Sequence, residues 1–418
     1  SDVCSSDLTT AAVVSVPQLS VVESGLGGGL ELAAITAAVV GGVSISGGAG
    51  TIVGVAAAVV LLAALRSSLV YVQLGESATA WEPAIYGVCL LGAVVLDPRR
   101  RRVAGVPEVG RGAGVAWAPP AVLIAGTIGM AWLLAPEFLS WRTQGVLASQ
   151  ASEVALLALA MLPVLLMGGI DLSVGSAMAL ASVSAGLLAG AGAPPVVCAA
   201  GAVCCGAACG LFNGVLVAVG RIHPLVVTLA TLSLFRGLAQ GVTGGRPLGP
   251  FDASWTALGS ATVGGVPVVL MPAACLAMVM GVVLWRGVMG VGIRAVGDRV
   301  VAARYCGLPV ARWTVMVYAM SGAMAGVAAC VFIAKRNTAK ADVGMGMELD
   351  VITACVLGGV SLAGARGGVL GVAAGVAALH GLRQFVAWRW YHDEVILIVL
   401  GAALVLGVVL AGGLRRTR

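Results

Sequence analysis

The chain has 418 residues, of which 60% are hydrophobic and 10% charged, and its formal net charge is +6. Soluble globular domains are nearer to about 45–50% apolar and about 25% charged, so this composition excludes a soluble domain and indicates many membrane spans. The arginines lie at the ends of apolar runs, as the positive-inside rule predicts, so the charge does not indicate nucleic-acid binding. Ten cysteines and three histidines show no ligand-type spacing, so we predict neither a metal site nor a catalytic cluster.

The first part of the chain is residues 1–102. Its opening, SDVCSSDL, differs in character from the apolar sequence after it, and we expect residues 1–24 to be a non-native or truncated start. Residues 25–102 contain an apolar, glycine-rich stretch, an apolar span at about 83–97 and an arginine run. The polar stretch 103–116 is then predicted to be a cytoplasmic linker.

The second part, residues 117–418, is predicted to be an all-α transmembrane bundle, because it contains runs of about 20 apolar residues. The predicted spans are 117–135, 146–167, 173–191, 195–219, 222–242, 266–285, 313–334 and 394–412. Between the last two lies 350–379, which is interrupted by GGVSLAGARGG and is predicted to be broken or re-entrant. If this segment crosses twice, the unit has about ten crossings.

The basic clusters give the direction of these spans. Residues 97–102, the loop 286–312 and the C-terminal RRTR all fall on one side, which we assign to the cytoplasm. Lys335, Arg336 and Lys340 fall on the opposite side and disagree with the rule. Since three clusters agree, we expect both ends of the complete unit to be cytoplasmic.

The chain also contains an internal repeat. Residues 27–66 match residues 344–383 without a gap at 22 of 40 positions, including Glu31 with Glu348. Each copy is followed by an apolar span and an arginine-rich end, and both copies run in the same direction. Residues 25–102 are therefore predicted to be the C-terminal part of a first unit, joined to a complete second unit.

Four motifs occur in order along the second unit. They are GGIDLSVGSAMAL (168–180), NGVLVAVGRIHPLVVTLATLSLFRGLAQGVTGGRP (213–247), RAVGDRVVAARYCGLPVARW (294–313) and GMGMELDVITACVLGGVSLAGARGGVLG (344–371). Together they closely resemble the sugar-type permease subunits of bacterial ABC importers, the group serving ribose, xylose, galactose, rhamnose and autoinducer-2. The resemblance covers 117–418 nearly end to end, and 25–102 resembles the C-terminal part of the same family.

The resemblance implies a multi-pass subunit of the bacterial cytoplasmic (inner) membrane that forms half of a pore. Its expected partners are a second permease subunit, identical or different, a periplasmic sugar-binding protein and cytoplasmic ATP-binding subunits, besides the lipid bilayer. The chain has no GxxxxGK[ST] motif, so ATP is expected to bind to a partner and the chain is expected to be neither an enzyme nor the holder of a cofactor.

The loop 286–312 resembles the coupling loop of importer permeases, which contacts the ATPase. It is predicted to contain a short helix that ends at Gly307, with Pro309 stopping its continuation. The family's acidic residue is missing, because Val300 and Val301 stand at the expected positions, which puts a salt bridge to the ATPase in doubt. The candidate coupling residues are Arg294, Gly297, Asp298, Ala302, Ala303, Arg304 and Gly307. The alternative is an ordinary basic cytoplasmic loop.

Polar residues inside the apolar runs are candidates for either the translocation path or helix packing, because burying them in lipid is costly. For Asp171, with Ser173 nearby, we favour a helix N-cap over substrate contact, and for Asn213 we favour a bridge between helices. Glu153 and Arg236 are expected to face the bundle interior. The full set for path or packing is Asp171, Ser173, Asn213, Arg236, Glu348, Asp350, Gly358, Gly359 and Ser361.

Three rival interpretations remain open at this point. A secondary transporter or facilitator for a small polar solute would need an ion-coupling residue in the bundle, for which Glu153 is the candidate. A membrane enzyme would need a convergent group of His, Asp or Cys. A non-functional fusion would follow if residues 1–102 disturbed assembly.

Overall fold

The structure is a computed structural model that describes residues 30–43, 51–71, 81–96, 121, 124–129, 132 and 136–390. The predicted start 1–24, the linker 103–116 and the last span 394–412 lie outside these residues, as does most of the span predicted at 117–135.

Within the described residues, six helices are long and apolar enough to cross a membrane. They are α6 (Trp141–Leu166), α8 (Pro195–Ala218), α9 (Pro224–Thr243), α11 (Met271–Arg286) with the 3-10 turn Val268–Leu270 before it, α14 (Val310–Arg336) and α16 (Val369–Trp390). A seventh apolar helix, α7 (Val174–Gly190), is shorter. The predicted all-α membrane bundle is therefore confirmed.

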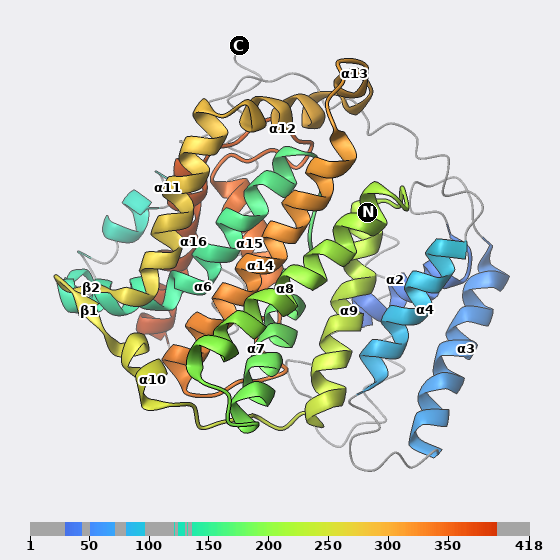
Figure 1. Ribbon diagram of the computed structural model, residues 1–418, viewed down its shortest axis with the longest axis horizontal. Coiled ribbons are helices and arrows are strands. Elements are labelled where there is room, and N and C mark those ends of the chain that lie inside the picture. The colour runs from blue at the N-terminus through green and yellow to red at the C-terminus, as the bar shows by residue number, and fades with distance from the viewer. Residues whose placement is uncertain are drawn as a thin grey trace.

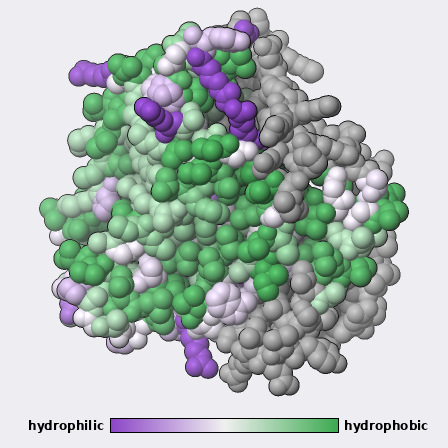
Figure 2. Space-filling model, turned by 45° about the vertical axis from the view of Figure 1, so that its right-hand side comes forward, coloured by the Kyte–Doolittle hydropathy of each residue, from purple (hydrophilic) through white to green (hydrophobic). Residues whose placement is uncertain are grey.

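The short elements lie at the two ends of the bundle (Figure 1). At one end are α12 (Val288–Asp298) and α13 (Val300–Tyr305). At the other end are α10 (Ala253–Ser260) and a two-stranded hairpin of β1 (Thr262–Val263) and β2 (Val266–Pro267). Figure 2 shows an apolar surface between these ends and hydrophilic residues near them, which is the pattern of a protein surrounded by lipid.

Small residues allow the central helices to pack closely. A Cβ atom on Gly206 of α8 would overlap the carbonyl oxygen of Gly322 of α14, and one on Gly326 would lie 2.5 Å from the carbonyl oxygen of Ala202. Cys198 and Cys209 are buried on the same helix, α8, as small apolar residues. Close backbone approach of this kind drives helix association where lipid provides no hydrophobic force.

The two copies of the repeat have the same local structure. Helix α2 (Leu30–Val40) corresponds to α15 (Met347–Leu357), since each bound of α15 lies 317 positions after that of α2. In the first copy Gly41 lies against Gly54, and in the second Gly358 lies against Gly371. Gly42 and Gly359 have φ angles of 85° and 80°. In both copies the described residues therefore form a helix, a glycine turn and a second helix packed on that turn, although the assignment of 25–102 to a first permease stays a prediction.

The second copy forms the predicted broken segment. After α14, Ala339 pairs with Leu248 near the α10 end, and the chain then runs without helix to Gly346, where α15 begins. The break after α15 reaches the end of α6, where the N–H of Ala365 donates to the carbonyl oxygen of Leu166 (2.8 Å). Helix α16 returns to the opposite end, where Phe385 packs on Phe138. The segment thus enters and leaves at the same end, as the predicted topology requires.

The segment differs in detail from the prediction. The stretch 337–346 before α15 is also non-helical, and the second helix continues beyond the predicted end at residue 379, since α16 runs to Trp390. Gly344 and Gly346 have φ angles of 72° and 79°, a conformation that favours glycine and prevents the helix from beginning earlier.

Candidate functional site

Helix α13 is the short helix predicted in the coupling loop. Its end is a Schellman motif: the N–H of Leu308 donates to the carbonyl oxygen of Ala303 (3.1 Å) and the N–H of Gly307 to that of Arg304 (2.9 Å). Gly307 has a φ of 79°, which explains why a glycine stands there. The helix is six residues long and ends at Tyr305, two residues before the predicted end.

The two alanines of the predicted coupling motif face opposite ways. Ala302 is exposed, whereas Ala303 is 3% exposed and packs with Val296 and Val310 inside this chain. A partner can therefore touch Ala302 but not Ala303 while α13 keeps this position. Beside Ala302 on the outward face lie Val301 and Tyr305, which are 65% and 89% exposed.

Val301 and Tyr305 were not among the candidate coupling residues predicted from the sequence. Their helical spacing of four residues, with Ala302 between them, could have identified one outward face. Of the other candidates, Asp298 and Arg304 are exposed, and Arg294 donates from Nη1 to the carbonyl oxygen of Leu284 at the end of α11 (2.6 Å). Arg294 therefore joins α12 to α11.

Gly297 places helix α12 against the break between α15 and α16. A Cβ atom at this position would overlap the carbonyl oxygen of Leu166 and lie 2.7 Å from the amide nitrogen of Ala365. Gly364, with a φ of 94°, also lies against the backbone of Gly297. Thus α12, the end of α6 and the break meet by backbone contact, a convergence that the sequence did not indicate.

The remaining candidates in the break shape its turn. Ser361 donates its N–H to the carbonyl oxygen of Arg366 (2.9 Å), and its hydroxyl oxygen accepts the N–H of Ala363 (3.2 Å). Gly358 allows α15 to contact α16 at Gly371, and Gly359 follows with a positive φ. These contacts give the break a defined shape.

Asp171, Ser173, Asn213 and Ser321 form a buried polar network in the middle of the bundle, and each is at most 2% exposed. Oδ1 of Asp171 accepts the N–H (3.0 Å) and the hydroxyl (2.7 Å) of Ser173, and Oδ2 accepts the hydroxyl of Ser321 (3.1 Å). Nδ2 of Asn213 donates to the Ser173 hydroxyl oxygen (2.7 Å). The network joins the start of α7 to α8 and α14. The N-cap residue of α7 is Ser173, which makes no side-chain capping bond, and Asp171 contacts this residue rather than an N–H of the helix itself.

Arg236 holds the non-helical stretch that precedes α15. It is 6% exposed on α9, and its Nη1 donates to the carbonyl oxygens of Ala341 (2.8 Å) and Val343 (2.6 Å). Non-helical backbone inside a membrane protein needs partners of this kind, because lipid supplies none. Glu348 lies next to this stretch, with Oε2 2.9 Å from the position of a Cβ atom on Gly175.

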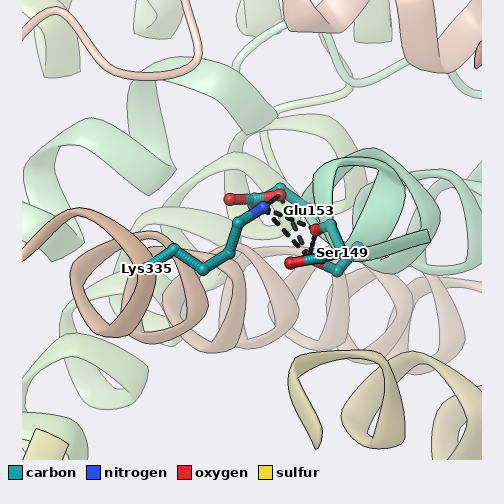
Figure 3. Close-up of polar contacts among 4 residues, drawn as sticks. Ser149, Glu153 and Lys335 are labelled. Atoms are coloured by element: carbon teal, nitrogen blue, oxygen red, sulfur yellow. Dashed lines mark hydrogen bonds and ion pairs between the residues drawn. The ribbon is translucent and has the colours of Figure 1, made fainter. Parts of the chain in front are cut away.

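Glu153 and Lys335 form a buried ion pair between α6 and α14 (Figure 3). Nζ of Lys335 lies 2.8 Å from Oε2 of Glu153 and donates to the carbonyl oxygen of Ser149 (2.5 Å). The side chain of Lys335 is 10% exposed and that of Glu153 is 5% exposed. Lys335 is thus a paired charge in the last turn of a span, which removes it from the loop cluster that disagreed with the positive-inside rule.

Asp350 of α15 pairs with Arg383 of α16, with 2.6 Å between Oδ2 and Nη1. The first copy of the repeat has Arg66 in place of Arg383 but Ala33 in place of Asp350. Of the two copies, therefore, the second alone carries both residues of this ion pair.

Comparisons with known proteins agree with this architecture. The family described as "Branched-chain amino acid transport system / permease component" matches residues 145–408. The chain belongs to this family. It is 33% identical over 262 residues to the autoinducer 2 import system permease protein LsrD of Yersinia pseudotuberculosis (strain IP 31758) and to that of Yersinia pestis (strain Pestoides F). Each alignment covers 61% of this chain and 79% of the relative, and no solved structure gives a significant match.

Family and structure together confirm the main prediction from the sequence. The chain is a multi-pass permease subunit of an ABC importer in the bacterial inner membrane. As part of an import system, it works with ATP-binding and substrate-binding partners. The match begins at residue 145, so it does not bear on the identity of residues 25–102.

Proposed function

We propose that this permease imports a monosaccharide or a related small polyol or signal molecule, driven by ATP that a partner hydrolyses. The motifs of the second unit resemble sugar-type permeases, and the relatives named above are autoinducer 2 import permeases. The family description names branched-chain amino acids instead, so leucine is the substrate to test against the sugars.

The observation that carries the mechanism is the contact of Gly297 with Leu166 and Ala365. The outward face of α13, with Val301, Ala302 and Tyr305, is the surface that an ATP-binding partner would move. Because α12 follows α11 and precedes α13, a shift of α13 displaces α12. Backbone contact at Gly297 then carries the shift into the break, since packed backbone has little freedom to deform.

The break is in turn connected to the middle of the bundle. Helix α15 joins the break, which follows Leu357, to the non-helical stretch held by Arg236, which ends at Gly346. Broken helices with non-helical backbone at membrane depth commonly line transport pathways. We assign the path to this region, with Glu348 and the start of α7 at its side.

A secondary transporter is less well supported. Its candidate coupling residue, Glu153, already forms an ion pair with Lys335 and accepts the hydroxyl of Ser152 (3.1 Å). The Glu153 carboxylate is buried between α6 and α14 and already has two partners, so we infer that it holds these two helices together. We further propose that the chain has no catalytic activity of its own.

The substrate class can be tested on the assembly itself. A tagged full chain is purified from its native membranes with its partners, placed in nanodiscs, and ATP hydrolysis is measured with ribose, rhamnose, autoinducer-2 or leucine together with the co-expressed binding protein. We expect a sugar or autoinducer-2 to stimulate hydrolysis and leucine to leave it at the basal rate. Stimulation by leucine alone would overturn the proposed substrate class.

A further inference from the structure

Helices α8 and α14 run antiparallel, with their backbones in contact (Figure 1). A Cβ atom on Gly210 of α8 would overlap the carbonyl oxygen of Tyr318 of α14, and one on Gly206 would overlap that of Gly322. From one contact to the next, the chain goes back four residues on α8 and forward four residues on α14, which is about one helical turn on each. The two helices therefore face each other in a fixed register.

This register brings two cysteines opposite each other. Its next pair is Ala202 with Gly326, whose backbones are also in contact, and the pair after that is Cys198 with Cys330. The helices are still close at this level, because the thiol of Cys330 donates to the carbonyl oxygen of Ala199, the residue after Cys198 (3.9 Å). The two thiols also lie within electrostatic range of each other. A disulfide needs facing Cα atoms about 4.4–6.8 Å apart, which helices in backbone contact provide.

The other cysteines of α8 face different residues on α14. In the same register, the residues opposite Cys204, Cys205 and Cys209 are Met324, Ala323 and Ala319. Within α8, Cys205 is the second cysteine after Cys198, and seven residues of helix place it about 10 Å further along the axis, beyond the reach of a disulfide. Among the described cysteines of α8, therefore, Cys198 alone faces a cysteine of α14.

The cysteine pair lies at the end of the bundle that carries α10. Trp255 of α10 donates from Nε1 to the carbonyl oxygen of Cys330 (3.1 Å), and α8 begins at Pro195, only three residues before Cys198. The basic clusters assign this end of the bundle to the periplasm. Disulfides form and persist in the bacterial periplasm, whereas thiols in the cytoplasm are kept reduced. The position of the pair thus suits oxidation.

We propose that Cys198 and Cys330 form a disulfide in the mature protein, which joins α8 to α14 at the periplasmic end of the bundle. The bond constrains the unfolded chain between the two cysteines, so it stabilises the fold. It also fixes two helices that the glycine contacts already hold together. The break between α15 and α16 lies at the other end of the bundle and stays free to move.

The oxidant that this step needs is a periplasmic protein with a reactive disulfide. Cys330 is half-buried and Cys198 is 1% exposed, so the oxidant reaches Cys330 first. The thiolate of Cys330 attacks the disulfide of the oxidant and forms a mixed disulfide. Cys198, whose thiol donates to the carbonyl oxygen of Ala193 (3.4 Å), then turns toward α14 and attacks the mixed disulfide as a thiolate. The oxidant leaves as a dithiol, so two electrons and two protons have passed to it from the permease.

The test asks whether these cysteines hold the two parts of a cut chain together. A cleavage site for a sequence-specific protease is inserted into the full chain between Gly264 and Gly265, at the exposed turn between β1 and β2. Cells are harvested in N-ethylmaleimide, which blocks free thiols and prevents their later oxidation. The purified chain is then cut, and its two fragments are run on denaturing gels with and without reductant.

Cys198→Ala and Cys330→Ala remove the proposed partners, and Cys275→Ala, at an exposed position on α11, is the matched control. We expect the fragments of the parent and of Cys275→Ala to stay joined until reductant is added. The fragments of Cys198→Ala and of Cys330→Ala should separate without reductant. Mass spectrometry of the parent, which does not depend on how the variants fold, should find the peptide of Cys198 linked to that of Cys330.

Two results would overturn the proposal. Parent fragments that separate without reductant would show that no bond joins the two parts of the chain. Fragments that stay joined in Cys330→Ala would show that another pair of cysteines forms the bond. None of these measurements depends on transport, so the proposed function can fail or stand independently.

Discussion

The backbone of Gly297 lies directly against the carbonyl oxygen of Leu166, with no room for a side chain between them. This contact places the loop that we propose as the contact of the ATP-binding partner on the end of a central span and on the break between α15 and α16. A permease must transmit movement from its cytoplasmic end into the bundle, and here the described residues provide a direct route.

Gly297→Val should therefore uncouple transport from ATP hydrolysis. The added side chain would overlap Leu166 and approach Ala365, and overpacking of this kind typically costs about 1–3 kcal/mol. We expect uptake to fall about tenfold or more, because α12, the end of α6 and the break can no longer pack as one unit, while the protein still inserts and hydrolysis continues. Gly281→Val on α11 is the control, because a Cβ atom at Gly281 has no neighbour within 4 Å, and it should transport at the parental rate.

Ala302 and Ala303 should respond differently to tryptophan. Ala302→Trp changes an exposed residue, and a change on the surface shifts the melting temperature by only about 1 °C. The same substitution should block contact with the ATP-binding partner, so that substrate no longer stimulates ATP hydrolysis. Ala303→Trp overfills a buried site and should lower the melting temperature by several degrees. Leu258→Trp, on the exposed surface of α10, is the control at the opposite end. Unchanged coupling in Ala302→Trp would place the partner's contact elsewhere.

The Glu153–Lys335 ion pair should stabilise the fold. Removing one of its two charges should lower the stability more than removing both charges together. Either Glu153→Leu or Lys335→Leu alone leaves a buried charge without its partner, which costs about 3–5 kcal/mol. The double change removes both charges and should cost clearly less than the two single changes added together. Thermal unfolding of all four proteins in detergent measures this, and additive losses would show that the two side chains act independently.

The topology predicts opposite labelling of the two ends. Tyr305→Cys, at a position 89% exposed on α13, should react only with a thiol reagent that reaches the cytoplasm. Ser260→Cys at the end of α10 should react with a membrane-impermeant reagent added outside the cell. Ser254 is left unchanged, because its hydroxyl donates to Asp252 (2.5 Å) at the start of α10. Both cysteines are placed in a chain without native cysteines, and labelling of both from one side would refute the topology.

The sequence predicted the features that depend on local pattern. Apolar length predicted the spans, the repeat predicted two similar helix–break–helix structures, and Gly307 predicted the end of α13. Asp171 and Ser173 stand two positions apart, so a contact between them could also be expected from the sequence, whereas the predicted capping role stays a prediction. The domain division and the roles of the candidate residues stay predictions.

Contacts between distant residues could not be predicted in this way. Glu153 and Lys335 are 182 residues apart, and their signs alone do not bring them together. The contact of Gly297 with Leu166 and Ala365 depends on how three elements pack together. The spacing of glycines and alanines in the sequence does not show which elements they will touch. The burial of Ala303 was missed because a helix of six residues shows too few turns to distinguish its faces.

The most direct test of the account is substrate uptake in cells that supply the ATP-binding and substrate-binding partners. The measurement compares the parental system with one in which the P-loop lysine of the ATP-binding partner is replaced by alanine. We predict that uptake of the imported sugar or signal molecule falls to background in the altered system and about tenfold or more in Gly297→Val, with normal amounts of the permease in the membrane. Uptake that continued at the parental rate without ATP hydrolysis would contradict the account and identify a facilitator.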